Sequence, residues 1–240
     1  MVQQGHNHKT GFFIAIGLIG LFAVLTGFST TFLIPLGEGE FKAPFIIYVH
    51  ALLAFSWILL FITQSHLIQK NNLNQHRRIG FAGIFVAIGI TATFVPVGLY
   101  QVEKELAQGF GPTATSSLVG TITSALIFIS LVLAGLLKRR VPPIHKRLML
   151  LATILLLWPA WFRFRHFFPS IPNPEIWFAI VLADSLIVVA ILWDKIKHRS
   201  VHPVLLYVGL FIILEHTVEA YMFDSPLWRE LADGLYRLLK

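Results

Sequence analysis

Apolar residues run along this chain in long blocks, and the ionisable residues fall mostly in short clusters between the blocks. A block of about 20 apolar residues, wound as a helix, crosses the roughly 30 Å hydrocarbon core of a bilayer. Seven blocks reach that length, so the sequence predicts an all-α fold, a polytopic bundle of seven transmembrane helices. The predicted spans are residues 11–36, 43–69, 76–100, 116–137, 144–167, 175–193 and 201–222.

The chain is predicted to divide at residue 223, where the last apolar block has ended. Residues 1–223 form the transmembrane domain, and residues 224–240 form a C-terminal amphipathic helix. Ser225 is suited to cap this helix, and Pro226 is suited to its first position. One face collects large apolar side chains, namely Leu227, Trp228, Leu231, Leu235, Leu238 and Leu239. The helix is predicted to lie in the outer membrane interface, with docking to a partner protein as the alternative.

Composition excludes a soluble domain. The 240 residues are 56% hydrophobic and only 13% charged, with a mean hydropathy of +0.73, whereas soluble domains are about 25% charged. The lipid bilayer is therefore the expected surrounding. Cysteine is absent, which excludes disulfides and thiolate metal sites. The net charge of +7 does not indicate nucleic acid, because the basic residues lie in short loop clusters rather than in one patch.

The basic residues predict the orientation of the spans. If the N-terminus is cytoplasmic, the inner loops hold only one acidic residue, Asp194, beside Lys9, Lys70, Arg77, Arg78, Lys138, Arg139, Arg140, Lys146, Arg147, Lys195, Lys197 and Arg199. Membrane proteins retain Lys and Arg preferentially in cytoplasmic loops. The sequence therefore predicts a cytoplasmic N-terminus and a C-terminus on the outer side.

Two inner loops echo each other. Residues 70–80 and 139–149 each contain a short turn followed by a histidine, two basic residues and an aliphatic residue, and a looser copy precedes the last span. The echo fits stacked helical hairpins or the repeated use of one topology signal. His76, His145 and His202 then lie at the inner membrane surface, where hydrogen bonds to loop carbonyls or lipid phosphates are expected.

A longer pattern carries a resemblance. The second span contains His50-x6-Trp57-x3-Phe61-x2-Gln64, and the motifs His-Arg-Arg-Ile-Gly (76–80) and His-Lys-Arg-Leu-Met (145–149) follow. This pattern resembles a group of uncharacterised bacterial multi-pass membrane proteins, which implies a location in the bacterial inner membrane and no particular activity. The His-rich spans are also similar, more distantly, to haem-b membrane cytochromes of the b561 type. Trp57 and Phe61 themselves are expected to form a packing seam.

Several ionisable residues fall inside the predicted spans, where a charge costs on the order of 2.5–3.5 kcal/mol. Asp184 lies near the middle of the sixth span, and Glu215, Glu219 and Arg163 lie in the outer half of the membrane. Such residues are expected to face a shared interior rather than lipid. Asp184, Glu215 and Arg163 are the predicted catalytic residues. The alternative is charge balance alone, with Arg163 paired to Asp184 or Glu215.

Three histidines share the depth of these groups. His50, His166 and His216 come from three different spans, and they are the predicted cofactor ligands. Two imidazoles from separate helices could hold haem b. A single Zn or Fe is the other prediction, with the three histidines, Asp184 and Glu219 as its candidate ligands.

Three functions are compatible with this pattern. The first is a redox or lipid-modifying membrane protein that acts on a lipid or a quinone-like small molecule. The second is a proton- or cation-coupled transporter, in which Asp184, Glu215 and Glu219 form the ion path. The third is a non-catalytic accessory or lipid-binding subunit with a membrane-protein partner. A retinal protein is excluded, because no lysine lies within residues 201–222 to form a Schiff base.

Overall fold

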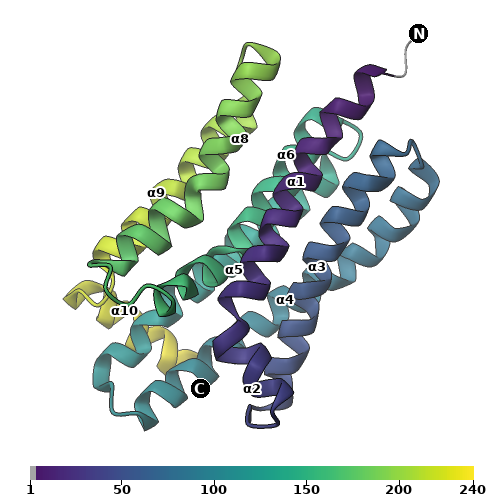
Figure 1. Ribbon diagram of the computed structural model, residues 1–240. Helices are drawn as coiled ribbons and strands as arrows, with labels where there is room; N and C mark the ends of the chain where they lie inside the picture. Colours follow the sequence, from purple (N-terminus) through teal and green to yellow (C-terminus); the bar gives the residue numbers. More distant parts are fainter. Residues whose placement is uncertain (1–3) are drawn as a thin grey trace.

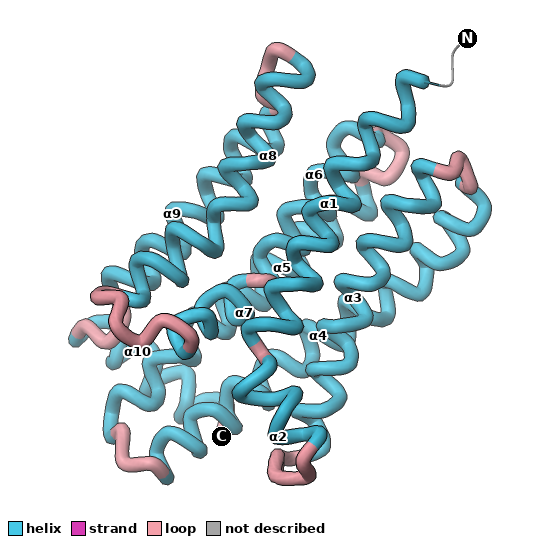
Figure 2. The backbone as a smooth tube through the Cα atoms, viewed as in Figure 1, coloured by secondary structure: helices cyan, strands magenta, loops and turns pink. Residues whose placement is uncertain are grey.

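The computed structural model describes the backbone of residues 4–240 and the side chains of residues 11–240. Throughout that part of the chain the regular structure is helical, and no strand is present (Figure 2). The helices in chain order are α1 (Gln4–Gly27), η1 (Ser29–Leu33), α2 (Ile34–Gly37), α3 (Phe45–Gln69), α4 (Leu73–Ala107), η2 (Gly111–Ser116), α5 (Ser117–Leu137), α6 (Pro142–Leu156), α7 (Trp158–Phe162), η3 (Arg163–His166), η4 (Glu175–Leu182), α8 (Ala183–His198), η5 (Val204–Val208), α9 (Gly209–Met222) and α10 (Pro226–Leu239).

Within residues 4–240, six stretches of helix are long and apolar enough to cross a membrane. They are Phe45–Gln69, Leu73–Ala107, Gly111–Leu137, Pro142–His166, Glu175–His198 and Val204–Met222. These stretches match the second to seventh predicted spans to within a few residues at most ends. The predicted first span differs, because the chain bends by 50° between Gly11–Gly27 and Ser29–Gly37. By length and composition, the described residues therefore hold six candidate spans, or seven if this bent pair is a single span.

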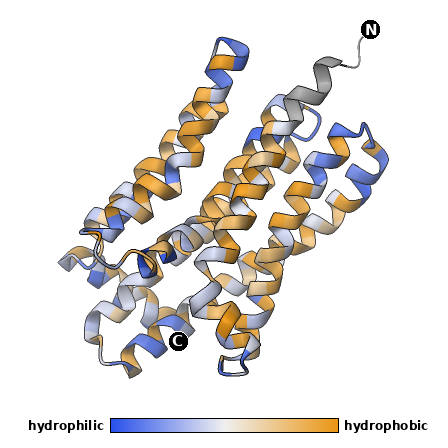
Figure 3. Cartoon of the chain, in the orientation of Figure 1, coloured by the Kyte–Doolittle hydropathy of each residue, from blue (hydrophilic) through white to orange (hydrophobic). Residues whose placement is uncertain are grey.

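The connecting loops lie at two ends of the bundle. The α3–α4, α5–α6 and α8–α9 connections share one end with the start of α1 (Figure 1). This end carries the hydrophilic clusters of Lys and Arg (Figure 3), and we call it the basic end. The α2–α3, α4–η2 and η3–η4 connections lie toward the other end, together with α10 (Figure 1), and we call this the opposite end. Successive long helices therefore alternate in direction.

Helix α6 lies at the centre of the bundle. In the apolar window of Pro142–His166, 61% of the residues are buried, against 17–39% in the five other spans. Its fully buried side chains include Leu150, Leu151 and Ile154. Trp57 and Phe61 of α3 are buried in the same core, and the Trp57 indole donates a hydrogen bond to Thr153 Oγ1 at 3.1 Å. The packing seam predicted for Trp57 and Phe61 is confirmed.

The predicted C-terminal helix is present, and part of its apolar face is docked on the bundle. Trp228 and Ala232 are buried beside Val119 of α5, and the Trp228 indole donates to the Ser116 carbonyl at 2.9 Å. Ser225 caps the helix by accepting from the Trp228 backbone N–H. A second stripe stays exposed, made of Leu227, Leu231 and Leu238. One helix thus contacts the bundle with one side and offers an apolar edge with the other.

Candidate functional site

A histidine and an aspartate form a buried pair between α8 and α9. His216 Nδ1 lies 2.7 Å from Asp184 Oδ1, and each side chain is at most 5% exposed. An ionised carboxylate only accepts hydrogen bonds, so Nδ1 carries the proton when Asp184 is charged. The remaining ring nitrogen, Nε2, is then the atom that can take up or release a proton.

Two glutamates extend this pair along α9. Glu215 Oε2 lies 3.8 Å from His216 Nε2. Glu219 follows Glu215 by one helical turn, so both carboxylates lie on one side of α9. Glu219 reaches across to α5, where a Cβ at Gly120 would overlap its carboxylate. The glycine therefore makes room for a buried acid, and three carboxylates surround or approach one imidazole.

Several polar atoms of this site have no hydrogen-bond partner among the described residues. They are Asp184 Oδ2, Glu215 Oε2, His216 Nε2 and the indole nitrogen of Trp158, whose ring centroid lies 6.2 Å from that of His216. Buried polar atoms are almost always paired in folded proteins. A group of unpaired atoms around one imidazole is therefore unusual, and it makes these residues the candidate site. We call Asp184, Glu215, His216 and Glu219 the acid–histidine cluster.

Along α8, apolar residues separate the cluster from the basic end. Between Asp184 and Asp194, α8 contains Ser185 followed by eight apolar residues, and Leu186, Ile187 and Ala190 are buried among them. Ser185 donates its hydroxyl to the Leu182 carbonyl. Toward the opposite end, Glu219 is followed by a small cavity of about 120 Å³ lined by Glu175, Ile176, Ala220 and Tyr221. The cluster is thus separated from the basic end by apolar side chains and continued toward the opposite end by acids.

The structure brings together only part of the predicted site. Asp184 and Glu215 meet at His216, but Arg163 does not join them. Arg163 donates to the Pro159 carbonyl at 2.8 Å, and its guanidinium lies 4.2 Å from the centroid of the Phe28 ring. No ion pair joins it to a carboxylate in the described part of the chain. Both the catalytic role predicted for Arg163 and its predicted pairing with Asp184 or Glu215 therefore lack support.

The predicted cofactor ligands are also separated. His50 lies 2.8 Å from Thr93 Oγ1 and joins α3 to α4, whereas His216 joins α9 to α8. These two hairpins lie on opposite sides of the bundle, with α1, α5 and α6 between them (Figure 1). His166 is exposed at the end of η3. The three histidines were predicted at equal depth along the membrane normal, but they do not meet. Depth does not determine where each helix lies around the bundle.

The predicted metal site is not supported. Over the described residues, no group of three or more His, Asp or Glu side chains is arranged to hold a metal ion. Of the predicted ligands His50, His166, His216, Asp184 and Glu219, only His216, Asp184 and Glu219 belong to one region of the fold. That region is the acid–histidine cluster, in which a hydrogen bond joins His216 to Asp184.

A second buried ion pair was not predicted. At the basic end, Arg147 Nη2 and Nε donate to the two carboxylate oxygens of Asp194 at 2.5 and 3.1 Å. Asp194 also accepts from the His202 backbone N–H at 3.0 Å. Arg147 was counted only as a topology signal, although Asp194 is the single acid in the inner loops. A single acidic residue among many basic ones is the sequence signal that would have predicted the Arg147–Asp194 ion pair.

Comparisons with protein-family models, curated proteins and solved structures found no match for this chain. The resemblance to bacterial multi-pass membrane proteins and the more distant similarity to b561-type cytochromes therefore stay predictions. The acid–histidine cluster is argued from its geometry alone.

Proposed function

We propose that this protein is a proton-coupled membrane transporter, with the acid–histidine cluster as its proton-binding site. The observation that carries the proposal is the buried Asp184–His216 pair, continued by Glu215 and Glu219 toward one end of the bundle only. Ionisable residues inside spans are costly, and where they pair with one another they commonly mark proton relays.

The order of the groups supports a route for the proton. A proton entering at the opposite end meets Glu219 first, then Glu215 and His216, and finally Asp184 near the middle of its span. Each group exchanges a proton with a partner on the same or the adjoining helix. Apolar residues of α8 then close the path toward the basic end. A site that opens to one side only is what alternating access requires of a single conformation.

The proposed orientation follows from the loops. We propose that the bent pair of α1 with η1 and α2 is a single crossing, which gives seven spans, and that the basic end faces the cytoplasm of a bacterial inner membrane. The clustering of Lys and Arg at the basic end supports this orientation. The cluster then takes its protons from the outer side, and the exposed edge of α10 lies in the outer interface.

The proposal is tested in liposomes that enclose a pH-sensitive dye. A potassium diffusion potential, negative inside, should acidify the lumen faster with the wild-type protein than in empty liposomes. Asp184→Asn and His216→Ala should each slow this uptake by roughly tenfold or more, the range lost when a proton-transfer group is removed. Thr93→Val is the matched control, because it removes another buried polar pair on the far side of the bundle and should leave uptake unchanged.

A second measurement reads the site without transport. The infrared difference spectrum of the reconstituted protein between about pH 5 and pH 8, the range in which a histidine changes its charge, should contain a protonated-carboxyl band. Asp184→Asn or Glu219→Gln should remove or shift that band. Uptake equal to that of empty liposomes, together with a spectrum that neither variant changes, would overturn the proposal.

A further inference from the structure

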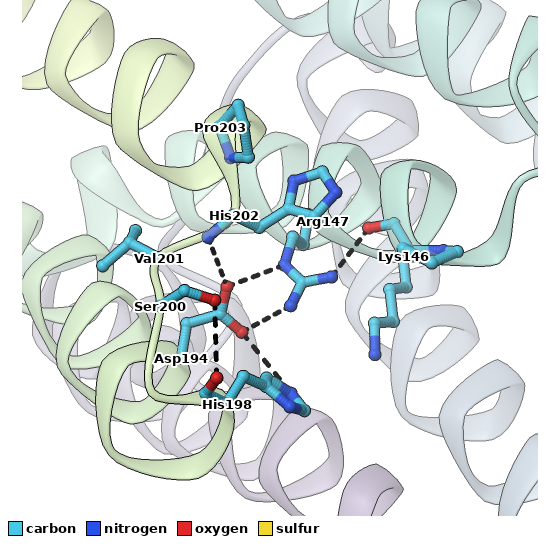
Figure 4. Close-up of a pocket in the computed structure, with 9 residues that line it drawn as sticks. Lys146, Arg147, Asp194, His198, Ser200, Val201, His202 and Pro203 are labelled. Atoms are coloured by element: carbon cyan, nitrogen blue, oxygen red, sulfur yellow. Dashed lines mark hydrogen bonds and ion pairs between the residues drawn. The ribbon is translucent and has the colours of Figure 1, made fainter.

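A pocket at the basic end is built around the Arg147–Asp194 pair and is separate from the acid–histidine cluster. Its volume is about 280 Å³, and it lies between the start of α6, the end of α8 and the connection that leads to η5. Helix α8 ends at His198, and Arg199 takes a left-handed conformation with φ of 58°. This turn folds residues 200–203 back over Asp194, so that the loop becomes one wall of the pocket (Figure 4).

The negative charge of the pocket is already neutralised. Asp194 is the only carboxylate among the described residues that line it, and both of its oxygens accept hydrogen bonds from Arg147. The other polar side chains of the lining are Lys146, His198, Ser200 and His202. Lys146 lies 5.3 Å from the Phe13 ring centroid, a cation–π contact that leaves its positive charge in place. The lining therefore carries an excess of positive charge and of hydrogen-bond donors.

His202 offers one of these donors. Its Nδ1 accepts a hydrogen bond from the Val204 backbone N–H at 3.2 Å, so the ring proton resides on Nε2. Burial, and next the charge of Arg147, hold the pKa of His202 below its ordinary value, while Asp194 acts in the other direction. At pH 7 the His202 ring is thus neutral, and its Nε2–H can donate a hydrogen bond to an anion.

The surroundings indicate where such an anion comes from. On the end of α8, Leu192 and Ile196 are 54% and 82% exposed, but each lies two residues from Asp194 and therefore on the side of the helix turned away from the pocket. The end of α8 and the turn after it carry further cations, Lys195, Lys197 and Arg199. The pocket lies at one end of helices that are long and apolar enough to cross a membrane, which is where the headgroup phosphate of a phospholipid lies. A free phosphate would meet the same lining without this membrane setting.

We propose that this pocket is a phosphate-binding site, and that the phosphate belongs to the headgroup of an anionic phospholipid. Lys146, His198 and His202 bind the phosphate oxygens, and the Arg147–Asp194 pair holds the wall that positions them. Charge-assisted hydrogen bonds to phosphate are among the stronger polar contacts of proteins. The proposal is independent of the transporter function, because none of these residues belongs to the acid–histidine cluster.

The test measures lipid binding to the purified full-length protein by native mass spectrometry. Phosphatidylglycerol is the anionic probe, phosphatidylcholine the zwitterionic one and inorganic phosphate the soluble one. The double variant Lys146→Gln/His198→Gln should weaken phosphatidylglycerol binding by about tenfold or more, the loss expected for two hydrogen bonds to a charged group. Lys138→Gln/Arg139→Gln is the matched control, because it removes two exposed charges at the same end of the bundle and should leave binding unchanged.

A third variant covers the case in which the double variant does not fold. Ser200 is exposed at the pocket and donates only to the His198 carbonyl at 3.4 Å, so Ser200→Glu adds a negative charge without removing a buried contact. It should weaken phosphatidylglycerol binding by a similar factor. Competition by inorganic phosphate at the same site would support the phosphate chemistry and overturn the lipid source. Equal binding by the site variants and the control variant would overturn the site itself.

Discussion

Two aspartates of one helix, ten residues apart, are buried in contrasting ways. Asp194 is hydrogen-bonded to a permanent cation: Arg147 and the His202 backbone satisfy its two oxygens, and the His198 ring lies farther away, with Nε2 3.8 Å from Asp194 Oδ1. Asp184 has a titratable partner in His216, and its Oδ2 has no hydrogen-bond partner among the described residues. The comparison teaches that burial of a carboxylate does not by itself indicate function. The chemistry of the partner, and the atoms left unpaired, separate a structural pair from a reactive one.

The charged groups around Asp194 and Asp184 also differ. Asp194 lies among the basic loops, where one carboxylate neutralises one guanidinium and fixes the α6–α8 contact. Asp184 lies beside two further acids, so the cluster contains more negative groups than one imidazolium can balance. Like charges this close repel one another, so the geometry of the cluster depends on its charge. In the Arg147–Asp194 pair the two charges are opposite and balance each other.

The largest effect on stability is expected from Asp194→Asn. The change leaves the Arg147 guanidinium buried without a counter-charge, which costs about 3–5 kcal/mol in unfolding free energy. Denaturant unfolding in a mild detergent measures this loss. The double change Arg147→Met/Asp194→Leu should recover most of it, because it removes both charges together. A loss below about 1 kcal/mol for Asp194→Asn would show that the pair is not the structural one of the two.

Asp184→Asn should cost less, about 1–2 kcal/mol, because the amide oxygen can still accept the proton of His216 Nδ1. Asp→Asn is thus expected to have a small effect on stability and a large effect on proton uptake at position 184. At position 194 its effect on stability is expected to be the larger of the two. Unfolding of both variants under identical conditions checks the ranking. If Asp184→Asn unfolds as readily as Asp194→Asn, the distinction between the two aspartates fails.

The long apolar helices were predicted well because composition alone is their signal. Long apolar blocks between ionisable clusters fixed the second to seventh spans to within a few residues at most ends. The first differed, because hydropathy does not report the 50° bend that follows Gly27. Gly27 packs so closely on the Ala160 backbone that a Cβ would overlap the Ala160 carbonyl, and a tertiary contact of this kind leaves no mark in a hydropathy profile.

The sequence predicted how deep the candidate site residues lie along the bundle axis. It did not predict where they lie around the bundle. Asp184, Glu215, Glu219 and His216 were singled out because charged residues in a span require partners, and the structure brings them to one region. Arg163, His50 and His166 lie elsewhere, since residues at equal depth can face different neighbours on different sides of a bundle. Helix order around the central α6 decides those neighbours, and a single sequence does not contain it.

The smallest effect on stability is expected at a third carboxylate, Asp224, which lies beside α10 and outside the long apolar helices. Asp224 accepts from Arg229, Thr113 and Ser116 beside α10, and its side chain is 23% exposed. Arg229 above all lowers the pKa of Asp224 to about 2, so its contribution to stability is complete above an unfolded pKa of about 3.9 and is lost as pH falls through about 2. Solvent limits that contribution to at most about 1 kcal/mol.

The fluorescence of Trp228, which docks α10, should therefore stay constant down to about pH 4 and change only below it. A change already near pH 6, or none in Arg229→Ala relative to wild type at pH 3, would mean that this exposed pair does not hold the helix.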